Sequence, residues 1–270
     1  MISLSEHFLL HMTANQPIKI KNALISVSDK TGLDELAKQL IAYKINLIST
    51  GGTATYLREH QYKVTDVSTI TSFPEMMDGR IKTLHPLIYA GLLNRPIVDE
   101  DILDEYSITN IDIVIVNLYP FEKTVSTDGC NEEMAIENID IGGPSMIRAT
   151  AKNYYSKTIL TDPNDYDTLK TELVNNQGCV SFTLRKQLAL KAFGYTASYD
   201  TAIWNYFSEN KNNTLPEIAD WIDEKNKPEI RRESTSTCCN ISTKRSRTEY
   251  ISWIQTASRQ RAVLQQLIGC

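Results

Sequence analysis

ALISVSDKTGLDELAKQLI, residues 23–41, is the stretch of sequence that decides the fold class. Its first five residues are mostly apolar or β-branched and predict a buried strand. A polar loop that ends at Gly32 follows, and the next apolar residues recur at helical spacing: Leu33, Leu36, Ala37, Leu40 and Ile41. A strand, a loop and an amphipathic helix in this order are typical of α/β proteins.

The same order of elements recurs further along the chain. Residues 45–49 predict a second strand, followed by a glycine-rich loop and a helix, and residues 113–116 and 158–160 predict two more strands. We therefore predict an α/β fold in which a parallel sheet carries helices on both faces. A helical arm should follow over residues 183–207, where one face is apolar: Leu184, Leu188, Ala192, Tyr195 and Tyr199.

The composition is that of a soluble globular protein. The 270 residues are 41% hydrophobic and 23% charged. No apolar run approaches the roughly 20 residues that span a bilayer, and the N-terminus lacks a signal-like pattern, so we expect a cytoplasmic protein without a membrane partner. The five cysteines lack metal-ligand spacing, which predicts reduced thiols and neither a metal site nor disulfides.

Two loops that follow predicted strands are candidates for binding phosphate. Ser28-Asp29-Lys30-Thr31-Gly32 and Thr50-Gly51-Gly52-Thr53 each precede a helix, whose backbone N–H groups and dipole can hold an anion. Alternatively they are ordinary turns, because neither matches a P-loop or a dinucleotide-binding fingerprint. The polar stretch DGRIKTLHP, residues 78–86, adds Arg80, Lys82 and Thr83. Together these loops predict a basic pocket for a phosphorylated small molecule.

Six motifs, taken in order, resemble a known family. They are SVSDKTGL (26–33), STGGTATYL (49–57), FPEMMDGRIKTLHP (73–86), VNLYPF (116–121), IDIGGPSMIRATAKN (139–153) and RKQLALKAFGYTASYD (185–200). Over roughly residues 22–230 the chain resembles the N-terminal half of the bifunctional AICAR transformylase/IMP cyclohydrolase of purine biosynthesis. The resemblance implies a methylglyoxal-synthase-like fold and ring closure of the nucleotide FAICAR to IMP with loss of water. It implies no cofactor, and a homodimer that would be weakened here because the transformylase half is absent.

The resemblance also implies which residues form the site. The catalytic candidates are Lys82, Tyr119, Asp140 and Lys152. The candidates for substrate and phosphate binding are Ser28, Lys30, Thr31, Thr50, Gly51, Gly52, Thr53, Arg80, Thr83, Asn117, Ile141 and Gly142. Structural roles are the alternatives: Lys152 as a partner of a helix dipole, Asp140 as a helix cap and Tyr119 as a packed aromatic residue.

The end of the chain departs from the family. The transformylase half opens with a motif similar to RYGENPHQ, but residues 230–243 are IRRESTSTCCNIST. With suitable codons, this segment read one base later gives YGENPHQHAAIYQ, and residues 258–266 in the same shifted frame give AGKELSYN. We therefore predict an N-terminal extension (1–21), the cyclohydrolase domain (22–207), a linker (208–229) and an out-of-frame, disordered tail (230–270) without transformylase activity.

Three other functions remain open from the sequence. A catalytically decayed nucleotide-binding module would keep the binding loops without turnover. A methylglyoxal-synthase-like lyase would need an acidic loop of the GGDQQ kind, which the sequence lacks. A nucleic-acid binder would use the basic segment 230–270, which holds seven Lys/Arg and two Asp/Glu on a chain of net charge −5. An out-of-frame origin explains that charge without nucleic acid.

Overall fold

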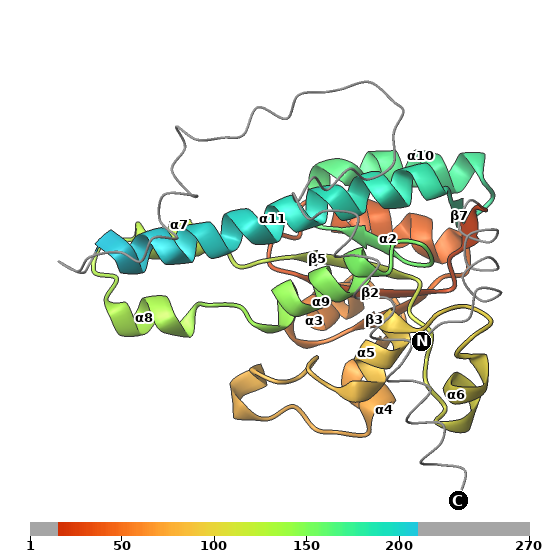
Figure 1. Ribbon diagram of the computed structural model, residues 1–270, viewed down its shortest axis with the longest axis horizontal. Helices are drawn as coiled ribbons and strands as arrows, with labels where there is room; N and C mark the ends of the chain where they lie inside the picture. Colours follow the sequence, from red (N-terminus) through yellow and green to blue (C-terminus); the bar gives the residue numbers. More distant parts are fainter. Residues whose placement is uncertain (1–15, 210–270) are drawn as a thin grey trace, which may run out of the picture. The chain divides into compact units, whose positions relative to one another are not determined.

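A five-stranded parallel sheet forms the core of the part of the chain that the structure describes. The computed structural model describes residues 16–209 (Figure 1). The strand order is β4-β3-β2-β5-β6, and every neighbouring pair is parallel. The strands are β2 (Asn22–Val27), β3 (Asn46–Ser49), β4 (Val64–Asp66), β5 (Ile113–Asn117) and β6 (Thr158–Leu160). This confirms the predicted parallel α/β sheet, to which the structure adds β4.

The order of the strands reverses beside β2. The chain first adds β3 and β4 on one side of β2 and then returns to add β5 and β6 on the other. Ala23 of β2 therefore lies opposite Leu47 of β3 and also opposite Ile113 of β5. In open α/β sheets, ligands bind outside the carboxyl ends of the strands at such a reversal. Here the loops after β2 and β5 meet at that point.

Helices cover the sheet, with α2 and α10 on one side and α5 and α9 on the other (Figure 1). The helices before β5 are α2 (Leu33–Ala42), α3 (Gly51–Glu59), α4 (Val67–Thr71), η1 (Met77–Gly79), α5 (Pro86–Leu93) and α6 (Glu100–Glu105). Those after it are α7 (Phe121–Val125), α8 (Glu132–Glu137), α9 (Gly142–Lys152), η2 (Pro163–Asp165), α10 (Tyr166–Asn175) and α11 (Phe182–Glu209). The predicted apolar face of α2 is buried except for Ile41, which is 40% exposed.

The helical arm is a single long helix, α11, as predicted. It packs on β6, α9 and α7 and lies across one side of the sheet (Figure 1). It begins beside a small antiparallel pair formed by β1 (Ile18–Lys19) and β7 (Cys179–Val180). Strand β1 belongs to the segment predicted as an N-terminal extension, so part of that segment takes part in the fold.

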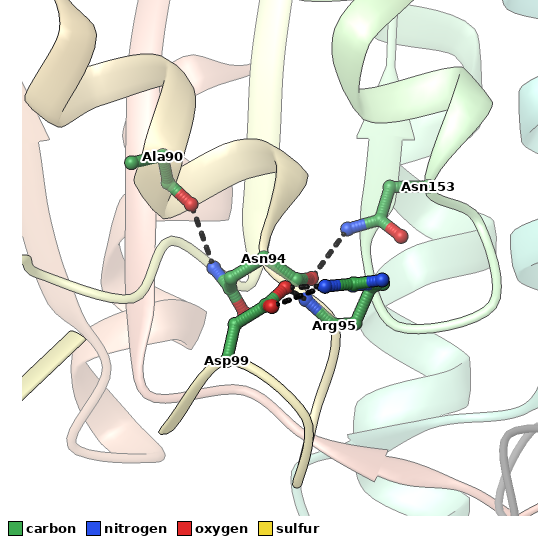
Figure 2. A network of polar contacts seen from close by, with 5 residues as sticks. All are labelled: Ala90, Asn94, Arg95, Asp99 and Asn153. Atoms are coloured by element: carbon green, nitrogen blue, oxygen red, sulfur yellow. Dashed lines mark hydrogen bonds and ion pairs between the residues drawn. The ribbon is translucent and has the colours of Figure 1, made fainter. Parts of the chain in front are cut away.

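A buried polar network lies at the amino ends of β5 and β6. The Lys157 ammonium donates to the side-chain oxygens of Asn94, at 3.3 Å, and Asn110. Asn110 in turn donates to Asp112, at 2.6 Å. Figure 2 shows Asn94 of this network, whose backbone carbonyl accepts a hydrogen bond from the Asn153 amide at 2.8 Å. The network fastens the end of α9 to the segment after α5, on the edge of the sheet opposite the carboxyl ends.

Two observations on residues 16–209 bear on function. No helix in this range is long and apolar enough to cross a membrane. No group of three or more His, Cys, Asp or Glu side chains in this range is arranged to hold a metal ion. Most of the predicted linker and the whole predicted out-of-frame tail lie outside the described residues, as do residues 1–15.

Candidate functional site

The loop after β2 is fixed by the last residue of β5. The side-chain oxygen of Asn117 accepts hydrogen bonds from the backbone N–H groups of Ser28, at 2.7 Å, and Asp29, at 2.9 Å. Its amide nitrogen donates to the backbone carbonyl of Asp29 at 2.9 Å. Asn117, predicted to bind substrate, therefore uses its side chain to hold the first candidate phosphate loop across the point where the strand order reverses.

The same loop is ordered from within. One carboxylate oxygen of Asp29 accepts from the hydroxyl of Thr31, at 2.6 Å, and from its backbone N–H, at 2.9 Å. These two hydrogen bonds lower the pKa of Asp29 below its ordinary value. The Thr31 side chain is exposed and that of Lys30 is half-buried. The Thr31 hydroxyl is thus engaged by Asp29 within the loop, and its role in binding phosphate stays a prediction.

The second glycine loop lies beside the first. The Thr53 hydroxyl accepts from the backbone N–H of Val27 and donates to its carbonyl, both at 3.0 Å, so this predicted binding residue joins α3 to β2. Thr50 is buried, and Gly52 is exposed. Gly51 has a φ of 53°, and a Cβ there would lie 2.9 Å from the Lys82 Nζ. Glycine adopts this backbone at little cost and leaves room for the lysine ammonium.

The charge of Lys82 reaches the carboxylate of Asp140. The Lys82 ammonium lies 3.8 Å from the carboxylate of Glu75 and close enough to Asp140 to affect its titration. Burial raises the pKa of Asp140 above its ordinary value, while the Gly143 N–H and the Lys82 charge oppose the rise. The Gly143 N–H donates to one carboxylate oxygen of Asp140 at 2.8 Å. This hydrogen bond to the start of α9 is the helix-capping contact that was the structural alternative for Asp140.

The start of α9 completes this group of loops. Any side chain on Gly143 would collide with Asp140, because a Cβ there would lie 2.5 Å from its second carboxylate oxygen. A Cβ on Gly142 would lie 2.8 Å from the hydroxyl oxygen of Thr83, a buried residue. The structure therefore brings Gly51, Lys82, Thr83, Asp140 and Gly142 together from three separate parts of the sequence.

Other predicted residues are exposed or have their contacts elsewhere. Arg80 forms a two-point ion pair with Glu137 of α8, with Nε and Oε1 3.2 Å apart, and both side chains are largely exposed. Tyr119 and Ile141 are each 59% exposed. Lys152 ends α9, and about 1.5 Å of rise per residue places it roughly 15 Å along the axis from Gly142. One chain does not bring Lys152 beside Asp140, and its catalytic role stays a prediction.

A cavity of about 580 Å³ lies at the carboxyl ends of β2, β5 and β6, and its lining does not include the group formed by Gly51, Lys82, Thr83, Asp140 and Gly142. Ser28 and Asn117 line it together with residues that sequence reasoning did not select, among them Lys123, Asp162 and Tyr195. The Tyr195 hydroxyl accepts from the Leu118 N–H at 3.0 Å, and the Tyr199 hydroxyl accepts from the Asp140 N–H at 2.8 Å. The sequence contained one signal for these tyrosines, because a tyrosine on a buried helical face usually finds a hydrogen-bond partner.

Comparisons with known proteins identify the fold and the family. Residues 32–145 match the MGS-like domain family, and residues 150–233 match the AICARFT/IMPCHase bienzyme family. The crystal structure of ForH aligns with a TM-score of 0.64 and 32% sequence identity, covering 70% of this chain and 97% of the ForH chain. The fold is thus the predicted methylglyoxal-synthase-like fold. The chain belongs to the AICARFT/IMPCHase family of purine biosynthesis, in which an MGS-like domain leads into the bienzyme region.

Proposed function

We propose that the protein is an IMP cyclohydrolase, which closes the ring of FAICAR to give IMP and water. The observation that carries this proposal is that Lys82 lies against Gly51 of the second glycine loop and its charge reaches Asp140, which lies against Gly143 at the start of α9. Membership of the AICARFT/IMPCHase family supports it. The loops after β2 and β3 would grip the phosphate and ribose, and the cation–carboxylate pair would act on the reacting end.

The reaction requires positioned proton transfers. The carboxamide nitrogen attacks the formyl carbon and forms the new C–N bond, while it loses one proton and the formyl oxygen gains one. The resulting hydroxyl then leaves as water with a second proton, and the formamide nitrogen loses its proton as the ring C=N bond forms. Holding both groups on a bound phosphate removes much of the entropic cost of the attack.

Asp140 and Lys82 suit the two sides of this transfer. In the proposal, the Asp140 carboxylate takes the proton from the attacking nitrogen, and the Lys82 ammonium faces the formyl oxygen, where negative charge develops. Gly51 permits the lysine to approach, and the Gly143 N–H fixes one oxygen of the carboxylate. Tyr119 follows Leu118 at the rim of the cavity and would supply a hydroxyl donor to the same oxygen.

Replacement of Lys82 tests the proposal directly. The purified 270-residue chain should convert FAICAR to IMP, followed by the change in absorbance. Lys82→Ala should lower kcat by about 10²- to 10³-fold, because the cation that faces the developing charge on the formyl oxygen is lost. Lys38→Ala, an exposed lysine on α2, is the matched control and should leave turnover unchanged. A wild-type chain that binds IMP without turnover would instead establish the decayed binding module, and unchanged turnover in Lys82→Ala would refute the assignment.

Asn117→Ala should weaken nucleotide binding more than it slows chemistry. The substitution removes three hydrogen bonds that hold the loop Ser28–Asp29, and leaves two backbone N–H groups without their partner. Such a loss costs about 1–3 kcal/mol, so we expect the Kd for IMP to rise about tenfold, measured by calorimetry. Asn46→Ala removes an exposed asparagine at the start of β3 and serves as the control. Equal affinities of the two variants would show that the loop binds no nucleotide.

We also propose, from the sequence, that residues 230–270 are out of frame and that the chain has no transformylase activity. The match to the bienzyme family runs to residue 233, close to the proposed change of frame. The nucleotide sequence of the gene tests this directly: a frame that continues one base later into the transformylase motifs would support it. A gene whose codons do not give those motifs in the shifted frame would refute it.

A further inference from the structure

Two tyrosines of α11 reach the backbone beside both parts of the candidate site. Tyr195 and Tyr199 are four residues apart and therefore share one face of the helix. The Tyr195 hydroxyl accepts from the backbone N–H of Leu118, directly before Tyr119, at 3.0 Å. The Tyr199 hydroxyl accepts from the backbone N–H of Asp140 itself at 2.8 Å. One helical turn thus contacts two loops that are far apart in the sequence.

Both N–H groups lie where regular structure cannot satisfy them. Leu118 follows the last residue of β5, and Asp140 lies in the loop between α8 and α9. Leu118 and Tyr199 are buried. Nearly all buried backbone N–H groups are hydrogen-bonded, so the two hydroxyls fill positions that neither the sheet nor α9 can fill.

The helix that carries these tyrosines is anchored at two places before them. Near its start, the Arg185 guanidinium donates to the backbone carbonyls of Tyr154, at 3.1 Å, and Tyr155, at 3.2 Å. Further along, Lys191 pairs with Asp162 at 2.7 Å and with Asp165 at 2.8 Å. These contacts join α11 to the segments before and after β6. They therefore fix the position of α11, and with it the positions of the Tyr195 and Tyr199 hydroxyls, relative to the sheet.

Beyond the tyrosines, an aromatic cluster holds the helix against α7. The ring of Phe121 makes edge contacts with Tyr199, at 6.4 Å between centroids, and with Tyr206, at 5.7 Å. Phe121 is the first residue of α7 and lies two positions after Tyr119. The cluster thus ties the same loop to α11 from its other side.

We propose that Tyr195 and Tyr199 are positioning residues that set the backbone of the Leu118–Tyr119 loop and of Asp140 for ring closure. The effect on catalysis rests on the proposed function, whereas the positioning itself is a property of the fold. Neither tyrosine is required to touch the substrate. Loss of one hydroxyl allows the loop that it holds to shift slightly. A catalytic step is sensitive to such shifts, because a displacement of about 1 Å can lower the rate about 10²-fold.

The charges around the two phenols agree with this role. Burial raises the pKa of both tyrosines above the ordinary value, the hydrogen bonds from Leu118 and Asp140 oppose the rise, and the Asp140 carboxylate adds to it. Both phenols therefore stay protonated and neutral near neutral pH. Each can accept from the backbone without placing a second negative charge beside Asp140.

Amide hydrogen exchange, followed by NMR on the full chain, tests the positioning without any need for activity. Tyr199→Phe should speed exchange at the Asp140 amide about tenfold, and Tyr195→Phe should do the same at the Leu118 amide. Tyr206→Phe is the matched control, because Tyr206 packs its ring on Phe121 from the same helix. Unchanged exchange at both amides in the first two variants would overturn the proposal, and each variant is a separate test should the other fail to fold.

Kinetics then separate positioning from a merely structural role. Tyr199→Phe should lower kcat about 10- to 100-fold with little change in KM, since the loops proposed to bind phosphate lie elsewhere. In an Asp140→Asn background the same substitution should cost less than about threefold, because the group it positions is already lost. Equal losses in both backgrounds would show that Tyr199 acts on stability alone. A wild-type chain without turnover would refute the proposed function, while the exchange result would still decide the positioning.

Discussion

Asp140→Asn is expected to lower the kcat of ring closure by about 10²- to 10⁴-fold while the protein keeps its fold. Asparagine has nearly the same size, and its side-chain oxygen can still accept the hydrogen bond from the Gly143 N–H. What disappears is the negative charge that faces Lys82 and the ability to take a proton. Turnover of FAICAR and the melting temperature, measured on the same preparation, separate the chemical effect from unfolding.

The role of Asp140 as a base also predicts how activity changes with pH. Only the ionised carboxylate can accept the proton, so activity should fall as the pH drops through the pKa of Asp140. Burial raises that pKa, and the acid limb of kcat/KM should therefore lie at higher pH than for an ordinary aspartate. The limb should vanish in Asp140→Asn and persist in Asp99→Asn, whose carboxylate pairs with Arg95 away from the site. An Asp140→Asn variant within about threefold of the wild type would refute the role as a base.

The sequence predicted the strands and helices in which apolar residues form a clear run or recur at regular spacing. Strands β2, β3, β5 and β6 are short apolar runs that end in polar loops, and α2 shows helical spacing, so each was found. Strand β4 was missed because it has only three residues, all half-buried. Strands β1 and β7 have two residues each, which is too few for any alternation to appear. Helix α5 is apolar throughout and shows no period, although His85 and Pro86 mark its start.

The site was predictable where a motif carries it and not where distant segments meet. The quoted motifs selected Lys82, Thr83, Asp140 and Gly142 as candidates, and the structure places them near one another. They did not show that Arg80 pairs with Glu137 or that the side chain of Asn117 is used to hold a loop. These contacts depend on which segments the sheet order brings side by side. A single sequence does not contain that order.

A large change of stability with pH is expected from Lys157, which lies at the amino ends of β5 and β6. Lys157 is 1% exposed, and its ammonium donates to Asn94 and Asn110 within reach of the Asp112 charge. Burial lowers the pKa of Lys157 to about 8, and the Asp112 charge opposes the shift without cancelling it. In the unfolded chain the lysine has the ordinary value of 10.5. Between these two values the unfolded state binds more protons than the folded state.

The sign of the stability change follows from that difference. Stability rises with pH wherever the unfolded state binds more protons, so the free energy of unfolding should increase between about pH 8 and pH 10.5. Each unit of pKa difference corresponds to about 1.4 kcal/mol, so the whole increase is about 3 kcal/mol. Below about pH 8 the lysine is charged in both states and adds no slope. Folding at neutral pH therefore carries the full cost of burying this ammonium group.

Lys157→Met isolates this contribution. Methionine fills a similar volume without a titrating group, so the rise of stability above about pH 8 should be absent in the variant. Urea unfolding at several values from pH 7 to pH 10 measures it, and the difference from the wild type removes the titration of the other lysines and tyrosines. Lys38→Met, on the exposed face of α2, should keep the wild-type slope. Parallel curves for wild type and Lys157→Met would mean that the buried ammonium keeps its ordinary pKa, held there by Asn94, Asn110 and Asp112.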